Sequence, residues 1–195
     1  MNSADAGAVT IVPGRRPQRA DARRNYEKLL AVARDAFAEN SAVTLEEIAR
    51  RAHVGIGTLY RHFPNRPALL EGIYVEQVEE LCRSARELAE VLAPWDALVA
   101  WLHRYVGYVG TKRALAEQLT AAIGAPTEVF GQCRQALFAD GEPLLTRAQE
   151  SGVVRTDVTF EEVVRMVSGI TMATFADEDQ MERVLDIALD GLRTR

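Results

Sequence analysis

Residues 44–66 read TLEEIARRAHVGIGTLYRHFPNR, and this stretch decides the fold of the N-terminal part of the chain. Its first part has the pattern of a short helix. Thr44 can cap that helix, and Glu47 can reach back to the Thr44 amide to complete a capping box. The apolar residues that follow recur at helical spacing and form one inward stripe, namely Leu45, Ile48, Ala49 and Ala52. The sequence therefore predicts a short helix that begins just after Thr44.

A second short helix follows at once, over residues 56–63. The connection of residues 53–55 is so short that the second helix must cross the first at a steep angle, as in a helix-turn-helix. On a helical wheel of the second helix, Leu59 and Phe63 share the inward face with Val54. We therefore expect these three side chains to form the seam between the two helices.

The opposite face of the second helix carries a different set of side chains. Gly57 and Arg61 point directly away from the core, and Thr58, Tyr60 and His62 flank them. A glycine lets the backbone come close to a groove, and the other side chains offer donors to phosphates and base edges. A helix that is only solvated would carry Glu and Lys there. The pattern indicates a helix that reads DNA.

At these residues the chain resembles the TetR family of transcriptional regulators, whose signature reads roughly T-x-x-x-I-A-x-x-A-G-V-S-x-G-T-x-Y-x-H-F-x-x-K. The matching residues are Thr44, Ile48, Ala49, Ala52, Val54, Gly57, Thr58, Tyr60, His62 and Phe63. His53 departs from the usual turn glycine, and Gly55 departs from the usual capping serine. Because His is enriched at positive φ among non-glycine residues, we expect His53 to adopt that conformation. Gly caps a helix nearly as well as Ser, so the motif is retained.

The outward face and the resemblance together give the residues that we expect to contact DNA. Ile56 and Thr58 would touch bases, and Arg61 would reach a base edge or a phosphate. Arg66 matches a family position whose basic residue binds a phosphate. Further phosphate contacts are expected from residues of both helices and from the start of the preceding helix. The full set is Arg23, Arg24, Thr44, Gly55, Ile56, Gly57, Thr58, Tyr60, Arg61, His62 and Arg66.

Charge is distributed unevenly along the 195 residues. The chain has a net charge of −5, to which residues 1–66 contribute +4 and residues 67–195 contribute −9. A basic excess confined to the segment with the motif favours local phosphate binding. Residues 1–19 are expected to form a disordered basic arm, which could enter a minor groove. The alternative is that the arginines of this arm only keep the terminus soluble.

The remaining periodicity is helical. A helix over residues 20–39 supports the motif, and a long helix capped by Asn65 follows it. The further helices are expected over residues 94–110, 112–122, 127–150, 160–175 and 179–193. The predicted fold class is all-α. A three-helix helix-turn-helix domain at residues 20–66 would precede a helical bundle for effector binding and dimerisation at residues 67–195.

The segment after Pro94 is apolar nearly all round, which predicts a central position in the bundle. Its aromatic seam is either solid core or the lining of a cavity. The resemblance favours a cavity, because the C-terminal domain of that family usually binds a small effector. The candidate lining residues are Trp101, Tyr105, Tyr108, Leu119, Phe130, Cys133, Leu137 and Met166. Such a lining predicts an apolar effector. The segments PWDALVAWLHRYV and LAEQL resemble the SbtR-like type of C-terminal domain.

The last two expected helices are amphipathic, which is typical of a helical interface between two copies of a chain. The candidate interface residues are Val163, Val167, Ile170, Met181, Val184, Leu185, Ala188 and Leu192. The alternative is that these helices only close the core of a single protomer. A twofold dimer would place two reading helices on a palindrome with half-sites about one helical turn apart.

No catalytic pattern is present, and we expect neither an enzyme nor a metal or cofactor site. Cys82 and Cys133 are isolated, which predicts two buried thiols in a reducing cytoplasm. Glu46 and Glu47 have the pattern of a solvated helix face. No stretch is apolar enough to cross a bilayer, so a cytoplasmic protein is expected. The predicted function is a homodimeric, ligand-responsive transcriptional repressor. An activator, a helical interaction protein without operator specificity and an enzyme with a helical pocket stay open.

Overall fold

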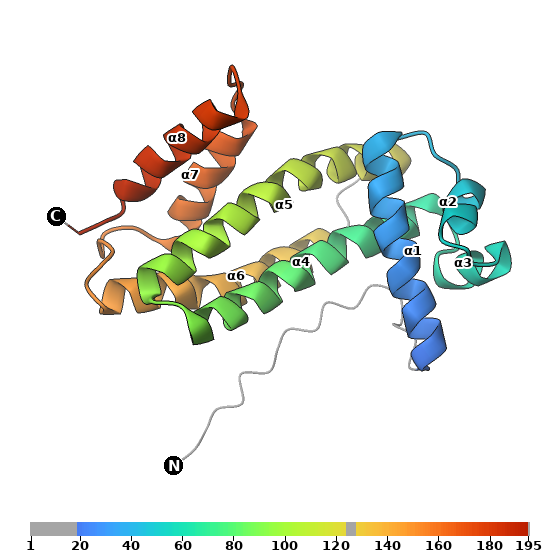
Figure 1. Cartoon of the computed structure of the whole chain (residues 1–195), viewed down its shortest axis with the longest axis horizontal. Coiled ribbons are helices and arrows are strands. Elements are labelled where there is room, and N and C mark those ends of the chain that lie inside the picture. Colours follow the sequence, from blue (N-terminus) through green and yellow to red (C-terminus); the bar gives the residue numbers. More distant parts are fainter. Residues whose placement is uncertain (1–18, 124–127, 195) are drawn as a thin grey trace, which may run out of the picture. The chain divides into compact units, whose positions relative to one another are not determined.

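The computed structural model of the protein describes residues 19–123 and 128–194 (Figure 1). The basic arm predicted over residues 1–19 lies outside the described residues except for Arg19. Its regular elements are α-helices, in agreement with the predicted all-α class. They are α1 (Ala20–Glu39), α2 (Leu45–Arg51), α3 (Ile56–His62), α4 (Arg66–Val91), α5 (Pro94–Ile123), α6 (Glu128–Glu150), α7 (Phe160–Met172) and α8 (Glu178–Asp190).

The described residues divide into two compact units. The first unit contains α1, α2, α3 and the start of α4 as far as Gln77, together with the end of α5 and the start of α6. The second unit contains the rest of α4, most of α5 and α6, and all of α7 and α8. The helix α4 therefore contributes to both units, and its two parts serve two different hydrophobic cores.

The core of the first unit lies between α1 and the two short helices. One apolar stripe of α1 is buried, and so are the apolar residues of α2 and α3 that face it. These core residues are Tyr26, Leu29, Leu30, Ala33, Phe37, Ile48, Ala49, Leu59 and Phe63. The start of α4 closes this core through Gly72. A Cβ there would lie 2.9 Å from Phe63 and 3.0 Å from Leu30, so only glycine allows this approach without a shift.

The transition from α3 to α4 follows the prediction closely. Phe63 ends α3 as its C-cap, and its N–H donates to the Leu59 carbonyl. The Asn65 side chain then accepts the Ala68 N–H at 2.9 Å, which caps the start of α4. Asn65 therefore fixes where α4 begins relative to α3.

The prediction of two helices over residues 94–110 and 112–122 is wrong, because α5 is continuous from Pro94 to Ile123. Gly110 lies inside this helix. A glycine in a helix interior costs only about 1 kcal/mol relative to alanine, and no proline interrupts the segment. Tertiary packing of the apolar helix is sufficient to offset that cost. The last two helices also end earlier than predicted, at Met172 and Asp190.

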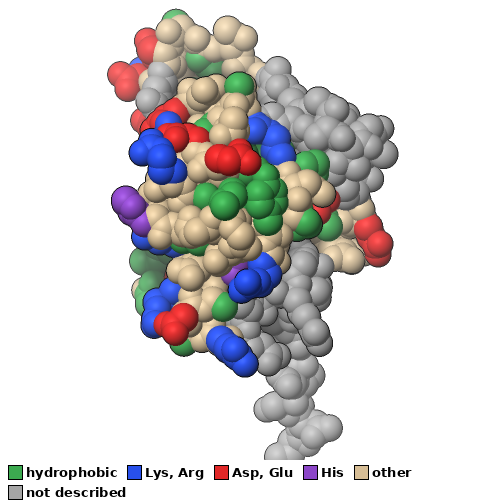
Figure 2. Space-filling view, turned by 90° about the vertical axis from the view of Figure 1, so that its right-hand side faces the viewer, with side chains coloured by type: hydrophobic (Ala, Val, Ile, Leu, Met, Phe, Trp, Pro, Cys, Tyr) green, Lys and Arg blue, Asp and Glu red, His purple; other side chains and the backbone are tan. Residues whose placement is uncertain are grey.

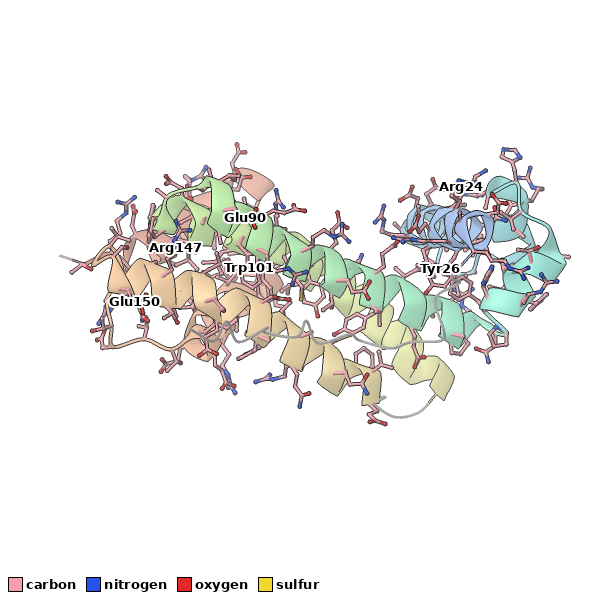
Figure 3. The ribbon with its side chains drawn as sticks, turned by 90° about the horizontal axis from the view of Figure 1, so that it is seen from below. Arg24, Tyr26, Glu90, Trp101, Arg147 and Glu150 are labelled. Carbon is pink, nitrogen blue, oxygen red and sulfur yellow. The ribbon has the colours of Figure 1, made fainter. Side chains whose placement is uncertain are left out.

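The core of the second unit is built around Trp101, which is fully buried. Its indole N–H donates to the Leu81 carbonyl of α4 at 3.1 Å. Its ring stacks on Tyr105 at 5.6 Å and lies 5.5 Å from the Phe160 ring. Gly141 of α6 allows this cluster to form, since a Cβ there would come within 2.5 Å of Phe160. Figure 3 shows Trp101 among the helices that supply these contacts.

Arg147 of α6 closes one end of the second unit (Figure 3). Its guanidinium donates to the carbonyls of Ala89 and Leu92 at 2.5 and 3.2 Å. These carbonyls lie at the C-terminal end of α4, where backbone acceptors have no partner within the helix. Arg147 therefore satisfies the end of α4 and ties it to α6.

Candidate nucleic-acid interface

Thr44 caps α2 as predicted. Its hydroxyl oxygen accepts the Glu47 N–H at 3.2 Å. The expected capping box is incomplete, because the Glu47 carboxylate does not accept the Thr44 N–H. It accepts instead from Arg50 at 2.8 Å and from Arg51 at 2.9 Å. These two guanidinium groups lower the pKa of Glu47 to about 2. The first turn of α2 is therefore held by one cap bond and a local ion-pair cluster.

The turn between α2 and α3 contains a strained residue. His53 has a φ of 50°, and it is the one non-glycine residue with a positive φ among those described. This confirms the positive φ predicted for His53, which stands where the family usually has a glycine. Gly55 then acts as the N-cap of α3, with a φ of −61° and a ψ of 138°. Its carbonyl accepts the N–H groups of Thr58 and Leu59.

The helix α3 presents the two faces that the wheel predicted. Leu59 is fully buried, whereas Gly57 and Arg61 are exposed. Ile56 and Tyr60 are large but exposed, at 40% and 43% of their surface. No atom lies within 4 Å of where a Gly57 Cβ would be, so the backbone is open to a close approach there. Thr58 lies half-buried beside this face.

His62 is held in place by α1. The His62 imidazole meets the Tyr26 ring edge-on, with the ring centres 5.8 Å apart. Burial lowers the pKa of His62, and the neighbouring Arg61 lowers it further. Tyr26 was not among the predicted site residues, because its position on the inward stripe of α1 signals only core. The structure shows that this core residue also orients a side chain at the edge of the α3 face.

Tyr60 makes a contact that sequence reasoning missed. Its hydroxyl donates to Glu46 Oε1 at 3.0 Å, which joins the outer face of α3 to the first turn of α2. The nearby backbone N–H of Glu46 lowers the pKa of its carboxyl group, and the hydroxyls of Tyr60 and Thr44 lower it further. The Glu46 carboxylate raises the pKa of Tyr60 in turn. Glu46 is therefore part of this surface and not simply a solvated residue.

Arg66, at the start of α4, faces the loop between α1 and α2. Its guanidinium donates to the carbonyls of Val43, at 2.6 Å, and of Ser41. It also lies 4.4 Å from the centre of the Phe37 ring. Burial lowers the pKa of Arg66. In this structure Arg66 thus positions the loop that leads into Thr44, and the phosphate contact implied by the resemblance stays a prediction.

The basic residues at the start of α1 are exposed and paired along the helix. Arg23 donates to Glu27 at 2.8 Å, and Arg24 donates to Asp21. Arg24 and Tyr26 project on opposite sides of α1 (Figure 3), which separates a charged side from the buried one. On the side of the molecule that carries α1 to α3, Figure 2 shows Lys and Arg side chains around a hydrophobic patch, with acidic side chains among them.

The candidate effector residues are spread over both units. Phe130 belongs to the first unit, where its ring meets Tyr74 edge-on at 4.8 Å. In the second unit, the side chains at five of the candidate positions are buried, namely Trp101, Tyr105, Tyr108, Cys133 and Leu137, and Met166 is half-buried. The Tyr105 hydroxyl is 3.0 Å from the Ser168 hydroxyl. The side chain of Leu119 lies outside those described.

The candidate interface residues of α7 and α8 fall into two groups. One group is buried within the protomer itself and comprises Val163, Val167, Leu185 and Leu192. The other group is partly exposed and comprises Ile170, Met181, Val184 and Ala188. The prediction missed Ile187 and Met172, which expose 73% and 57% of their surface on the same two helices. The first group is buried in a single protomer, which agrees with the alternative that these helices close the core of their own chain.

The cysteines and the acidic residues show no sign of another kind of site in the part of the chain that the structure describes. Cys82 and Cys133 are buried, as predicted, and neither is in a disulfide bond. Burial raises the pKa of Cys82 to about 12. Within residues 19–123 and 128–194, no cluster of His, Cys, Asp and Glu has the makings of a metal site. None of the described helices has both the length and the apolar composition needed to cross a membrane.

Comparison with known families supports the assignment made from the motif. Residues 29–73 match the family of bacterial regulatory proteins called tetR, and residues 93–194 match the SbtR-like C-terminal domain of transcriptional regulators. The second match alone spans more than half of the chain. The two matches cover the helix-turn-helix region and all of α5 to α8.

Individual proteins agree with these family matches. A TetR transcriptional regulator from Streptomyces coelicolor is 38% identical in sequence, with a TM-score of 0.75, over 86% of this chain and 98% of that one. A TetR regulator from Mycobacterium vanbaalenii is 32% identical, with a TM-score of 0.75, over 91% and 100% of the two chains. The transcriptional regulator UidR of Escherichia coli is 24% identical over 80% of this chain and 83% of its own length.

Proposed function

Because this chain belongs to the TetR family of DNA-binding transcriptional regulators and has an SbtR-like C-terminal domain, we propose that it is a ligand-released repressor. In this proposal two copies of the chain bind a palindromic operator, and a small apolar effector releases them. The observation that carries it is the exposed face of α3, which presents Ile56, Gly57, Tyr60 and Arg61 to solvent.

The proposed DNA contacts follow from the chemistry of that face. Ile56 and Thr58 contact bases, and Ile56 suits the methyl group of thymine because it is exposed and apolar. The Arg61 guanidinium reaches a base edge or a phosphate. The open backbone at Gly55 and Gly57 allows α3 to enter the groove closely. The remaining contacts are to phosphates and come from Arg23, Arg24, Thr44, Tyr60, His62 and Arg66.

The proposed dimer uses the exposed apolar side chains of α7 and α8. Ile187 is the strongest candidate, because a large aliphatic side chain with most of its surface in water has no role in the protomer core. The partly buried Ile170, Met181 and Val184 extend the same kind of surface. A twofold dimer would present two α3 helices to half-sites ~34 Å apart. This spacing gives the palindrome its length.

The proposed effector acts by favouring the form that does not fit the operator. A nearly complete switch requires the effector to bind the released form roughly 10⁴-fold more tightly than the DNA-bound form. The cluster of Trp101, Tyr105 and Phe160 is packed without room for a side chain at Gly141. The effector must therefore bind against other residues or displace this cluster. We propose that α4 transmits the effect of the effector, because this helix contributes to both units.

The test is selection of binding sites from a pool of random duplexes, with wild type, Tyr60→Ala and His62→Ala in parallel. The wild type is expected to enrich one palindrome, and both variants are expected to lose most of that enrichment. His103→Ala is the matched control, because His103 is exposed on α5 and belongs to the second unit. The proposal fails if the wild type enriches no palindrome, or if the Tyr60 and His62 variants enrich it as well as the control.

The dimer is tested separately by sedimentation. Ile187→Asp should shift the protein from dimer to monomer, because it places a charge where an apolar contact is proposed. Val153→Asp is the control, since Val153 is also exposed but lies outside α7 and α8. If Ile187→Asp sediments as a dimer, the dimer interface lies on another surface and the proposed interface is wrong.

A further inference from the structure

Glu46 binds a hydroxyl group that is proposed to contact DNA. Tyr60 donates to the Glu46 carboxylate at 3.0 Å. Tyr60 is also one of the residues proposed to contact a phosphate. A carboxylate that accepts a hydrogen bond from this hydroxyl makes the contact that a phosphate oxygen would make. The protein thus contains a negatively charged acceptor of its own at this position.

We propose that the Glu46 carboxylate takes the place of a DNA phosphate in the free protein and competes with that phosphate for the Tyr60 hydroxyl. This inference rests on the proposed phosphate contact of Tyr60. A phenol O–H can donate one hydrogen bond. Binding of DNA therefore exchanges one charged acceptor for another, and Tyr60 contributes less to affinity than a phenol without an internal partner would.

The exchange also has an electrostatic consequence. Once Tyr60 turns to the phosphate, the Glu46 carboxylate loses that bond while a second anion lies close to it. The two like charges repel within the Debye length of about 8 Å at physiological salt. Glu46 therefore weakens DNA binding in two ways, by retaining the hydroxyl in the free protein and by repelling the phosphate in the complex. A repressor that must be released gains from such a limit on its affinity.

The position of Glu46 explains why it can act without damaging the fold. Glu46 and Tyr60 are both exposed, and neither belongs to the core of the first unit. The neighbouring Glu47 provides a matched comparison. It lies in the same turn and carries the same charge, but its carboxylate is bonded to Arg50 and Arg51 and not to Tyr60. Removal of Glu47 changes the local charge without releasing the phenol.

A double-mutant cycle with Glu46→Ala and Tyr60→Phe tests the competition. The probe is the palindromic duplex that the wild type enriches, and affinity is measured at one fixed salt concentration. Glu46→Ala should bind roughly 3- to 10-fold more tightly than wild type. Tyr60→Phe should weaken the wild type by only about 2- to 3-fold but should weaken Glu46→Ala by about tenfold or more. In a Glu47→Ala background, Tyr60→Phe should cost the same as in wild type.

Each other outcome has a defined meaning. Equal costs of Tyr60→Phe with and without Glu46 would overturn the competition while leaving the phosphate contact of Tyr60 intact. No cost in either background would overturn the phosphate contact itself, and the inference with it. Glu46→Gln provides a variant of the same shape without the charge, and it should bind more tightly than wild type. If neither Glu46 variant binds more tightly, the inference is wrong.

A measurement without DNA checks the contact independently. Glu46 raises the pKa of Tyr60 in the structure. Ultraviolet titration of the phenols should therefore show a lower pKa for Tyr60 in Glu46→Ala than in wild type. Glu47→Ala should leave that pKa where it is in wild type. An unchanged Tyr60 titration in Glu46→Ala would show that the hydrogen bond is not formed in solution, which would also overturn the inference.

Discussion

The two units of the molecule use aromatic and polar side chains in opposite ways. In the first unit, Tyr60 and Arg61 are exposed on the short helix α3. The position of α3 depends on local backbone structure, including the helix cap at Thr44 and the strained turn at His53. In the second unit, Trp101 and its aromatic neighbours are closed off inside the bundle. Their positions are set by packing between helices that are far apart in sequence.

This difference determines what a substitution should do in each unit. A change on the exposed face of α3 removes no fully buried side chain, so it should alter DNA binding before it alters stability. A change in the aromatic cluster leaves a cavity or an overlap, so it should alter stability first. The outer face of α3 is therefore a surface whose position depends on the turns beside it, and the Trp101 cluster is a tightly packed core.

The largest effect is expected for Trp101→Ala. The substitution removes a fully buried indole and its hydrogen bond to Leu81, so the free energy of unfolding should fall by about 3–5 kcal/mol. Chemical denaturation followed by circular dichroism measures it. Trp95→Ala is the control, because Trp95 is half-exposed and packs against Arg193 at the surface. Equal losses at Trp95 and Trp101 would contradict the view that the Trp101 cluster is the centre of the core.

An overlap in the same cluster should have the next largest effect. The added methyl of Gly141→Ala would meet Phe160 at 2.5 Å and Trp101 at 2.9 Å. Overpacking of this kind destabilises by about 1–3 kcal/mol. Gly131→Ala in the same helix has no atom within 4 Å of its new methyl, so it should stabilise by about 0.5–1 kcal/mol. Thermal melting should therefore show a lower melting temperature for Gly141→Ala and a higher one for Gly131→Ala. An unchanged melting temperature for Gly141→Ala would mean that the aromatic cluster is packed more loosely than the structure shows.

In the first unit, the turn itself can be tested by His53→Gly. Removing the strain of a positive φ should raise the free energy of unfolding by about 1–2 kcal/mol. The greater freedom of glycine in the unfolded chain should lower it again by about 0.4–1 kcal/mol. The melting temperature should therefore rise slightly. The same substitution at His103, in the interior of α5, should lower stability by roughly 0.3–0.5 kcal/mol because glycine is a poor helix former. A loss of stability at both positions would mean that His53 makes a compensating contact.

The helix-turn-helix was predictable because its signals are local. The cap at Thr44, the stripe through Ile48 and the inward pair of Leu59 and Phe63 all lie within one short stretch, and the structure places each as expected. The positive φ of His53 was predictable for the same reason, since a tight turn needs that conformation at a known position. Backbone geometry over a few residues is what a single sequence encodes most directly.

Side-chain direction over longer separations was not predictable. Periodicity places Glu46 on an outer face, but it does not specify that its carboxylate meets Tyr60 on another helix. The resemblance assigns Arg66 to a phosphate, whereas the carbonyls of Ser41 and Val43 determine where its guanidinium lies here. The continuity of α5 through Gly110 likewise depends on packing by other helices. An acidic residue close to a motif that binds phosphate is the signal that could have drawn attention to Glu46.

The same limit applies to the residues of the last two helices. Amphipathic spacing identifies Val163 and Ile170 alike as apolar, yet Val163 is buried within the protomer and Ile170 is partly exposed. The spacing also missed Ile187, which lies on the exposed side of α8. A helix that faces both its own core and a partner has two apolar stripes, and periodicity alone does not say which stripe faces which.

The smallest expected effect concerns surface charge, where the two units should not differ. Arg50 and Arg51 lower the pKa of Glu47 from 4.5 to about 2, and Arg165 and Arg134 lower the pKa of Glu161 in the second unit. A lowered pKa stabilises the folded state above the unfolded pKa, and this contribution is lost as the pH falls through the folded pKa.

The stability difference between wild type and Glu47→Gln should therefore be constant above about pH 5 and should disappear as the pH falls toward the folded pKa of about 2. Glu161→Gln should show the same sign. Because these groups are exposed, added salt should weaken both effects. Denaturation curves over this pH range at low and high salt measure them. A much larger change in the free energy of unfolding for Glu161→Gln that persists at high salt would mean that the two units differ in their electrostatics as well as in the burial of their side chains.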